Sequence, residues 1–194
     1  MLHTYGRSPE PKPTAAVAIL HASSPDESIL LMRRAQRTGD PWSGHWSFPG
    51  GRTEASDADL LHTALRELRE ECGILLEREM LTERLADDWA GRVVGSSLMV
   101  APFVFQIPRQ IPAILDESEA AEAVWMPMST LRDLSLHRVR EIPGVPAERK
   151  FPAFELRGTP VWGFTYRVLC QWAGVPVAPE GLILKPLVDR TAIE

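Results

Sequence analysis

The sequence predicts an α/β protein of the mixed, α+β kind, with one mixed β-sheet flanked by helices. Short runs rich in Val, Ile and Leu alternate with turn signals that contain proline or glycine, which is the pattern of strands joined by turns. Two longer segments, 57–72 and 161–174, are typical of helices, and we find no internal repeat or low-complexity linker. The simplest organisation is therefore one domain over residues 14–194, after a polar, flexible N-terminal arm at 1–13.

The first two predicted strands are expected to pair, because the polar stretch between them, HASSPDE, is a turn signal. A loop broken by glycine and proline covers residues 36–46, and residues 47–51 close a short strand and open a tight Gly-Gly turn. Residues 137–160 are interrupted by prolines, and the tail from 175 to 194 carries no assignment. The predicted strands span residues 14–20, 28–35, 97–107 and 122–128. A third, short helix is predicted at 129–136.

Composition narrows the class of partner. The chain has 194 residues, a net charge of −5 and a hydrophobic fraction of 44%, as in an ordinary globular protein. Its net charge repels nucleic acid and anionic membranes, so neither is expected as a partner. A polyanionic small molecule would need a local cation, from side chains or from a metal, to counter that field.

The two cysteines and the ends of the chain bear on location. Cys72 and Cys170 lie far apart and fit neither a disulfide framework nor a zinc site, so a reducing cytoplasm is expected. The first residues contain no apolar signal core, and no stretch approaches about eighteen apolar residues. We therefore expect neither an export signal nor a membrane span.

The predicted helix at 57–72 has one apolar side. Asp57 is a good N-cap, Asp59 suits the first turn, where the helix dipole favours a negative charge, and Gly73 is a plausible stop. The apolar side is expected to pack on the sheet and consists of Leu61, Leu65, Leu68 and Cys72.

Three glutamates form a stripe on the rest of this helix. Glu67, Glu70 and Glu71 stand at i, i+3 and i+4, where like charges cost a few tenths of a kcal/mol. The stripe therefore does not serve helix stability. It is either a solvated face or a cation site, since converging carboxylates suit Mg²⁺ or Mn²⁺ and a phosphate-rich substrate would complete the coordination shell.

The segment from 51 to 74 resembles the Nudix box, the signature of hydrolases that cleave nucleoside diphosphates linked to another group. The second half of the box is matched by Arg66, Glu67, Glu70, Glu71 and Gly73. The first half departs, because Asp57 replaces the usual glutamate and is followed by eight rather than seven residues before Arg66. In this position Asp57 would cap the helix or pair with Arg66. The resemblance implies a Nudix-type α/β/α sandwich.

Upstream residues are similar to the motif of the coenzyme A pyrophosphatase subgroup of this family. LLMRRA at 30–35 and FPGG at 48–51 carry the likeness, together with Gly44. Met32 replaces a threonine of that motif, and the spacer is one residue longer, with its arginine displaced to Arg37.

The resemblance implies a metal-dependent attack of water on a pyrophosphate linkage. The substrate would be coenzyme A or acyl-coenzyme A, giving phosphopantetheine and adenosine 3′,5′-bisphosphate. The alternatives are another nucleoside diphosphate derivative, such as ADP-ribose, a dinucleotide or a nucleotide sugar, or a module that senses a nucleotide without cutting it. Many relatives dimerise, so a homodimer is one option.

The same resemblance implies roles for the box residues. Glu70 and Glu71 would bind Mg²⁺ or Mn²⁺ directly, Glu67 directly or through water, and the Gly50 carbonyl would complete the protein's share. Arg66 would orient a ligand carboxylate. The metal set is thus Gly50, Glu67, Glu70 and Glu71.

The general base is open at this stage. Glu67 is one candidate, and Glu119 or Glu122, just before Trp125, is another; either of these two downstream acids could also be a fourth metal ligand. The residues expected to act in catalysis are Arg66, Glu67, Glu70 and Glu119.

The substrate is expected to meet residues upstream of the box. On a strand Arg33 and Arg34 point to opposite faces, and Arg34 matches the subgroup motif. An aromatic side chain of the 36–46 loop could stack on a base, although its tryptophans could equally fold the loop onto the core. The expected substrate-binding residues are Arg34, Arg37, Trp42, His45 and Trp46.

Overall fold

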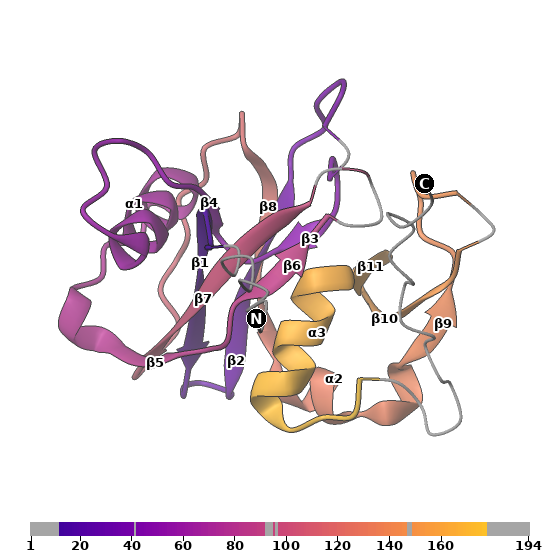
Figure 1. Ribbon diagram of the computed structural model, residues 1–194. Coiled ribbons are helices and arrows are strands. Elements are labelled where there is room, and N and C mark those ends of the chain that lie inside the picture. The colour runs from indigo at the N-terminus through magenta and orange to yellow at the C-terminus, as the bar shows by residue number, and fades with distance from the viewer. Residues whose placement is uncertain (1–11, 41, 92–94, 96, 147–148, 178–194) are drawn as a thin grey trace, which may run out of the picture.

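A computed structural model describes residues 12–40, 42–91, 95, 97–146 and 149–177. Within these residues a central eight-stranded sheet lies between helix α1 on one side and helix α3, with a three-stranded sheet, on the other (Figure 1). The central sheet comprises β1 (Ala15–Ala22), β2 (Ser28–Arg34), β3 (Trp46–Ser47), β4 (Gly50–Arg52), β5 (Leu81–Arg84), β6 (Asp88–Ala90), β7 (Leu98–Ile107) and β8 (Ala120–Pro127). The small sheet comprises β9 (Arg138–Arg140), β10 (Phe151–Leu156) and β11 (Thr159–Trp162). The helices are α1 (Leu60–Cys72), α2 (Met128–Arg132) and α3 (Gly163–Ala173), with short 3₁₀ turns η1 (Arg78–Met80) and η2 (Leu134–Leu136).

Strand β1 is the middle of the central sheet. It runs parallel to β7 along its whole length, from Ala15 opposite Val100 to Ala22 opposite Ile107, and antiparallel to β2 and β4. β2 in turn pairs antiparallel with β3 and β8. The sheet is therefore mixed, as predicted.

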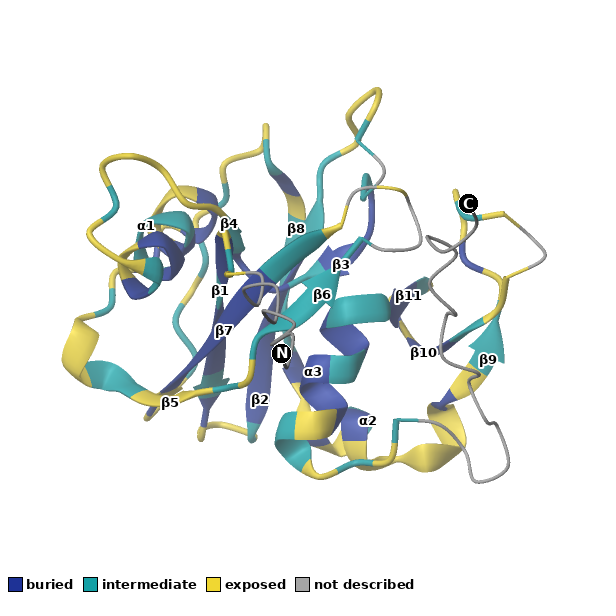
Figure 2. Cartoon of the chain, viewed as in Figure 1, coloured by how far each residue is buried: buried dark blue, intermediate teal, exposed yellow. Residues whose placement is uncertain are grey.

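Side chains alternate between the two faces of this sheet, and each face has its own core. On β1, Ala18 and Leu20 pack with Leu68 of α1, whereas Ile19 packs with Tyr166 and Leu169 of α3. Figure 2 shows the central strands as the most continuously buried part of the chain. These two cores make the α/β/α sandwich, and they confirm the predicted fold class.

The start of α1 differs from the prediction. Its N-cap is Asp59, whose Oδ1 accepts the His62 N–H at 2.8 Å, and not Asp57. The Asp57 carboxylate instead accepts hydrogen bonds from Arg66 and from the Thr63 hydroxyl, and it caps no backbone N–H of the helix. The predicted stop is confirmed, because Gly73 has φ +64° and its N–H bonds to the Arg69 carbonyl.

Other boundaries also shift. The predicted short helix divides into α2 and η2 at Asp133, and α3 begins at Gly163 because Val161 and Trp162 pair with β10 instead. Strands β9 and β10 and the start of β11 form in the proline-interrupted stretch 137–160, and β5 and β6 form in a region that received no assignment.

The ends of the chain are only partly described. Residues 1–11 of the predicted arm and 178–194 of the tail lie outside the described residues. Among the described residues, no helix combines the length and the apolar character needed to cross a membrane.

Candidate active site

The Gly-Gly turn before α1 packs directly on β1 and on the acidic helix. A Cβ atom on Gly50, which has φ +155°, would lie 2.4 Å from the Ala16 carbonyl oxygen and 2.7 Å from Val17 Cα. A Cβ on Gly51 would lie 2.3 Å from Glu67 Oε1. Only glycine fits against the backbone at Gly50, and a side chain at Gly51 would displace the Glu67 carboxylate. The two glycines therefore let the turn approach α1 closely enough to contact its carboxylates.

Glu71 is a buried carboxylate held against this turn. Its side chain belongs to a residue only 2% exposed, and its Oε2 accepts the Gly50 N–H at 2.8 Å. Burial raises the pKa of Glu71 to about 8, although the hydrogen bond from Gly50 opposes the shift. No basic side chain among the described residues forms an ion pair with Glu71. A buried acid without a counter-ion is the strongest sign in this site of a place for a cation.

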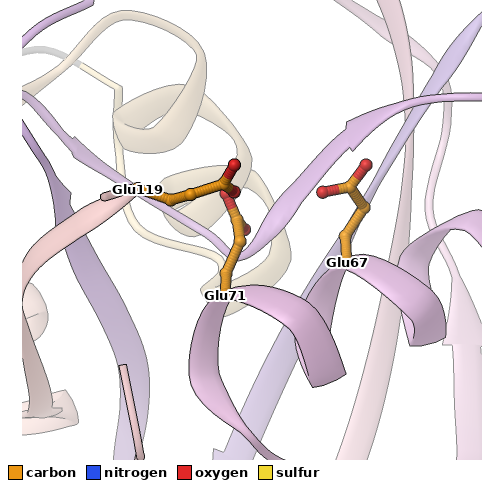
Figure 3. A group of neighbouring side chains, drawn as sticks. All are labelled: Glu67, Glu71 and Glu119. Atoms are coloured by element: carbon orange, nitrogen blue, oxygen red, sulfur yellow. The ribbon is translucent and has the colours of Figure 1, made fainter. Parts of the chain in front are cut away.

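Two further glutamates converge on Glu71. Carboxylate oxygens of Glu67, Glu71 and Glu119 lie within 4.8 Å of one another. Figure 3 shows Glu67 and Glu71 rising from α1, while Glu119 reaches toward them from the turn before β8. Burial raises the pKa of Glu67 as well, against the effect of its hydrogen bond from Arg66. This acidic cluster joins residues from two segments that are far apart in the sequence.

Glu70 lies apart from the acidic cluster. Its side chain is 46% exposed, and its Oε2 accepts a hydrogen bond of 2.9 Å from Arg66 Nη1. The same nitrogen donates to Glu67 at 2.9 Å. The direct metal contact expected for Glu70 thus stays a prediction, and in this structure its Oε2 is engaged by Arg66.

Arg66 connects the acidic helix to the loop before it. Its Nε and Nη2 donate to Asp57, and Nη2 also donates to the Arg52 carbonyl at 3.0 Å. The hydrogen bonds from Arg66 hold the pKa of Asp57 well below its usual range. Of the two roles open to Asp57, the structure shows pairing with Arg66 and not capping of the helix.

The two downstream acids are separated in space. Glu119 belongs to the acidic cluster, whereas Glu122 on β8 accepts hydrogen bonds from Arg33 at 3.2 Å and from Arg157 at 2.5 Å. Since both oxygens of Glu122 are engaged by arginines, the geometry favours Glu119 of the two.

A cavity of about 790 Å³ begins at the Gly-Gly turn and extends over β6, β10 and the start of α3. Its lining includes the basic residues Arg34, Arg52, Arg149, Lys150 and Arg167, and Asp88 is the one acidic residue among the described residues that line it. Aromatic side chains of Trp42, Trp89, Phe151, Trp162 and Phe164 form much of its wall. Part of this positive charge is balanced, because Arg34 pairs with Asp40, Arg167 with Asp88 and Lys150 with Glu141. The charge that remains suits an anion in a chain whose net charge is −5.

Four of the five predicted substrate residues line the cavity, namely Arg34, Trp42, His45 and Trp46. Trp46 is 2% exposed and donates from Nε1 to the Leu156 carbonyl at 3.0 Å, so it mainly packs the loop onto the core. Burial lowers the pKa of His45, which favours a neutral imidazole near neutral pH. Arg37 is not among the lining residues and points to the turn that carries Glu119.

The far wall of the cavity was not predicted. Asp88 and Trp89 lie on the three-residue strand β6, and Arg167 on α3 holds that strand by donating to Asp88 at 2.8 Å and to the Trp89 carbonyl at 2.7 Å. The sequence offered one signal, the adjacent charges of Arg149 and Lys150 in an otherwise proline-interrupted stretch.

Comparison with known proteins identifies the family. The family described as NUDIX domain matches residues 12–150, which include the Gly-Gly turn, all of α1 and the turn with Glu119. The chain belongs to the Nudix family. This confirms, at the level of the family, the resemblance seen in residues 51–74 and the expectation of a Nudix hydrolase.

Two curated relatives illustrate the range of similarity. An uncharacterized protein of Schizosaccharomyces pombe is 36% identical over 110 residues, which are 53% of this chain and 32% of the relative. An uncharacterized Nudix hydrolase NudL of Yersinia pestis is 28% identical over 155 residues, which are 80% of this chain and 75% of the relative. The chain thus spans about a third of the length of the first relative and three quarters of the second.

Solved structures share the fold. A NUDIX hydrolase from Alicyclobacillus acidocaldarius superposes with a TM-score of 0.55 and 19% identity, covering 86% of this chain and 98% of the other. RenU, a Nudix hydrolase from M. smegmatis, superposes with a TM-score of 0.51 and 20% identity, covering 86% of this chain and 89% of the other. The NUDIX domain of Shewanella oneidensis NrtR, solved with ADP ribose, superposes with a TM-score of 0.50 and 19% identity, covering 62% of this chain and 75% of the other.

Proposed function

We propose that this Nudix protein is a divalent-metal-dependent pyrophosphatase that acts on a nucleoside diphosphate derivative. The observation that carries the proposal is the placement of the acidic cluster. Three carboxylates converge on a Gly-Gly turn, and the same turn lines a cavity rich in basic and aromatic side chains. A metal ion at the cluster and a diphosphate at the mouth of the cavity would therefore be neighbours.

The residues present fit Mg²⁺ or Mn²⁺. The cluster offers carboxylate oxygens alone, which are the ligands that these hard cations prefer. A bound cation would neutralise Glu71, whose burial otherwise keeps its pKa near 8. Glu67, Glu71 and Glu119 would hold the ion, with Glu70 and the Gly50 carbonyl as further ligands.

The bound ion would supply charge neutralisation on the diphosphate oxygens. The chain's own residues would do the rest. Arg34 lines the cavity and its charge acts on Glu71. Its Nε and Nη2 donate to Asp40 at 3.3 and 3.0 Å, so it would bind a phosphate through Nη1. Glu119, at 38% exposure, would accept a proton from an attacking water on the carboxylate oxygen that does not bind the ion, and Glu67 is the alternative base.

For the substrate we propose coenzyme A or an acyl derivative, with phosphopantetheine and adenosine 3′,5′-bisphosphate as products. The motif at 30–51 supports this choice. The cavity supports it too, since its aromatic walls suit an adenine ring and its spread of basic residues suits a ligand with more phosphate than one diphosphate. ADP-ribose is the second candidate, because the similar NUDIX domain from Shewanella oneidensis was solved with that ligand.

A substrate panel tests both levels of the proposal. Purified protein would be assayed with Mg²⁺ or Mn²⁺ against coenzyme A, ADP-ribose, NADH, a dinucleoside polyphosphate and dNTPs, with products separated by chromatography. We expect coenzyme A to give the highest kcat/KM, and Glu71→Gln to abolish turnover. If coenzyme A is the poorest substrate, the choice of substrate is wrong. Nucleotide binding without turnover of any of them would instead indicate a sensing module.

A further inference from the structure

We infer that Arg37 is a positioning residue, which holds the turn before β8 so that Glu119 stays in the acidic cluster. This inference rests on the proposed function, because it concerns the placement of one of its acids. Arg37 donates from Nε at 2.9 Å and from Nη2 at 2.5 Å to the Ser118 carbonyl oxygen. Its Nη2 also lies 3.5 Å from Glu119 Oε1.

The turn that Arg37 holds is fastened at both of its ends. At one end the Asp116 N–H donates to the Glu71 carbonyl at 3.3 Å, which ties the turn to the end of α1. At the other end the Ala35 N–H donates to the Glu119 carbonyl at 2.8 Å, which ties it to the residue after β2. These backbone bonds place the Cα atom of Glu119, but they leave its side chain free to rotate.

Inside the turn, the Asp116 side chain accepts the N–H and the hydroxyl of Ser118 at 2.8 and 2.7 Å. The N–H of Ser118 is thereby occupied by Asp116 and its carbonyl oxygen by Arg37. The Ser118 peptide groups, next to Glu119, are therefore fixed on both sides. Removing Arg37 would free the Ser118 carbonyl oxygen, while the N–H of the same peptide group, that of Glu119, would still donate to the Asp116 carbonyl at 2.9 Å.

Arg37 also supplies the charge that the arrangement needs. Glu119 lies beside two other carboxylates and is 38% exposed, so repulsion would turn it toward solvent in the absence of a nearby cation. Arg37 is the basic residue that forms an ion pair with Glu119 among the described residues. A lysine could keep the charge and one hydrogen bond, but it lacks the planar fork that donates twice to the same carbonyl.

A role in positioning makes a different prediction from a role in substrate binding. If Arg37 bound the substrate directly, its replacement would raise KM, whereas a displaced Glu119 would lower kcat and weaken metal binding with KM nearly unchanged. Arg33 offers a matched control, because it forms an ion pair at 3.2 Å with Glu122 of the neighbouring strand, and Glu122 is not part of the acidic cluster.

The experiment compares Arg37→Ala, Arg37→Lys, Arg33→Ala, Glu119→Gln and the double variant Arg37→Ala/Glu119→Gln. Each is assayed for kcat and KM on the best substrate of the panel, for Mn²⁺ affinity by calorimetry, and for hydrogen exchange of residues 116–120. We expect Arg37→Ala to lower kcat by about 10- to 100-fold with KM within about threefold. Arg37→Lys should recover part of the activity, and exchange should accelerate in Arg37→Ala and stay unchanged in Arg33→Ala.

The double variant shows whether Arg37 affects kcat through Glu119. If Arg37 acts through Glu119, the double variant should be no slower than Glu119→Gln alone. Multiplied reductions in kcat, or a raised KM with an unchanged kcat, would overturn the inference. A wild-type protein with no turnover would instead count against the proposed function. In that case unchanged Mn²⁺ affinity and unchanged exchange in Arg37→Ala would overturn the positioning role as well.

Discussion

Arg66 donates hydrogen bonds to both oxygens of Asp57, from Nε to Oδ1 at 3.0 Å and from Nη2 to Oδ2 at 3.0 Å. The Asp57 side chain is fully buried and that of Arg66 is 9% exposed. The remaining nitrogen, Nη1, reaches Glu67 and Glu70 at 2.9 Å. One guanidinium thus joins the loop before α1 to the acidic face of the helix.

Replacing Arg66 by Gln should destabilise the protein by roughly 3 kcal/mol, because the buried carboxylate of Asp57 loses its counter-ion and keeps only the Glu54 N–H and the Thr63 hydroxyl. Urea unfolding of the metal-free protein measures the change in the free energy of unfolding. Arg78→Gln is the control, since it breaks the exposed Arg78–Asp59 pair and leaves the N-cap of α1 in place. Its effect should be much smaller. Similar destabilisation in the two variants would mean that the Arg66–Asp57 pair adds nothing to stability beyond an exposed pair.

Replacing Glu70 by Gln should lower kcat by about 100-fold or more while leaving the melting temperature nearly unchanged. The side chain is 46% exposed and its bond to Arg66 is one of several that Arg66 makes, so its loss should change the free energy of unfolding little. Circular dichroism and steady-state kinetics check the two parts. Glu83→Gln, an exposed substitution on β5, should change neither. Unchanged turnover in Glu70→Gln would remove Glu70 from the site.

The titration of Glu71 should lower the stability of the metal-free protein as pH rises from about 4.5 to about 8. Glu71 keeps its proton in the folded state up to a pKa of about 8, whereas in the unfolded state it loses that proton near 4.5. The folded state therefore binds more protons between these values, and its stability falls with pH, by an amount on the order of a few kcal/mol. Above pH 8 the decrease is complete.

Thermal unfolding in a chelator, from pH 5 to 9, measures this slope. The melting temperature of Glu71→Gln should change less with pH than that of the wild type, because the glutamine has no proton to lose. At pH 8.5, Mg²⁺ or Mn²⁺ should restore the melting temperature of the wild type and leave that of Glu71→Gln unchanged. Parallel pH profiles for the two proteins would contradict the raised pKa as the cause.

Local sequence patterns predicted those parts of the site in which all the residues come from a single helix or strand. Glu67 and Glu71 are neighbours because helix geometry places i and i+4 on one face, and the sheet strands were visible because buried aliphatic runs are contiguous. The choice between Asp57 and Asp59 as N-cap was different. Both suit a cap, and the buried partner Arg66, several residues later, decided it.

The parts that the sequence did not reveal depend on contacts between distant segments. Two acids near the start of β8 look alike in sequence, and Glu119 joins the cluster because its turn is tied to the end of α1 and to the residue after β2. Strands as short as β6 and β9 have too few residues for a pattern, so their partners in β7 and β10 determine them. The far wall of the cavity was missed for that reason.

The far wall yields the sharpest test of the substrate. Arg149 and Lys150 line the cavity, and both residues are exposed. Coenzyme A carries a phosphate on its ribose that dephospho-coenzyme A lacks, and a pair of cations beyond the diphosphate suits that group. Arg149→Ala/Lys150→Ala should therefore lower kcat/KM for coenzyme A roughly tenfold or more and leave that for dephospho-coenzyme A within about twofold. Arg138→Ala, an exposed substitution on β9 away from the cavity lining, should affect neither substrate. Equal reductions on both substrates would assign the two cations to the diphosphate or to the cavity's general field, and would leave the ribose phosphate without a partner at this wall.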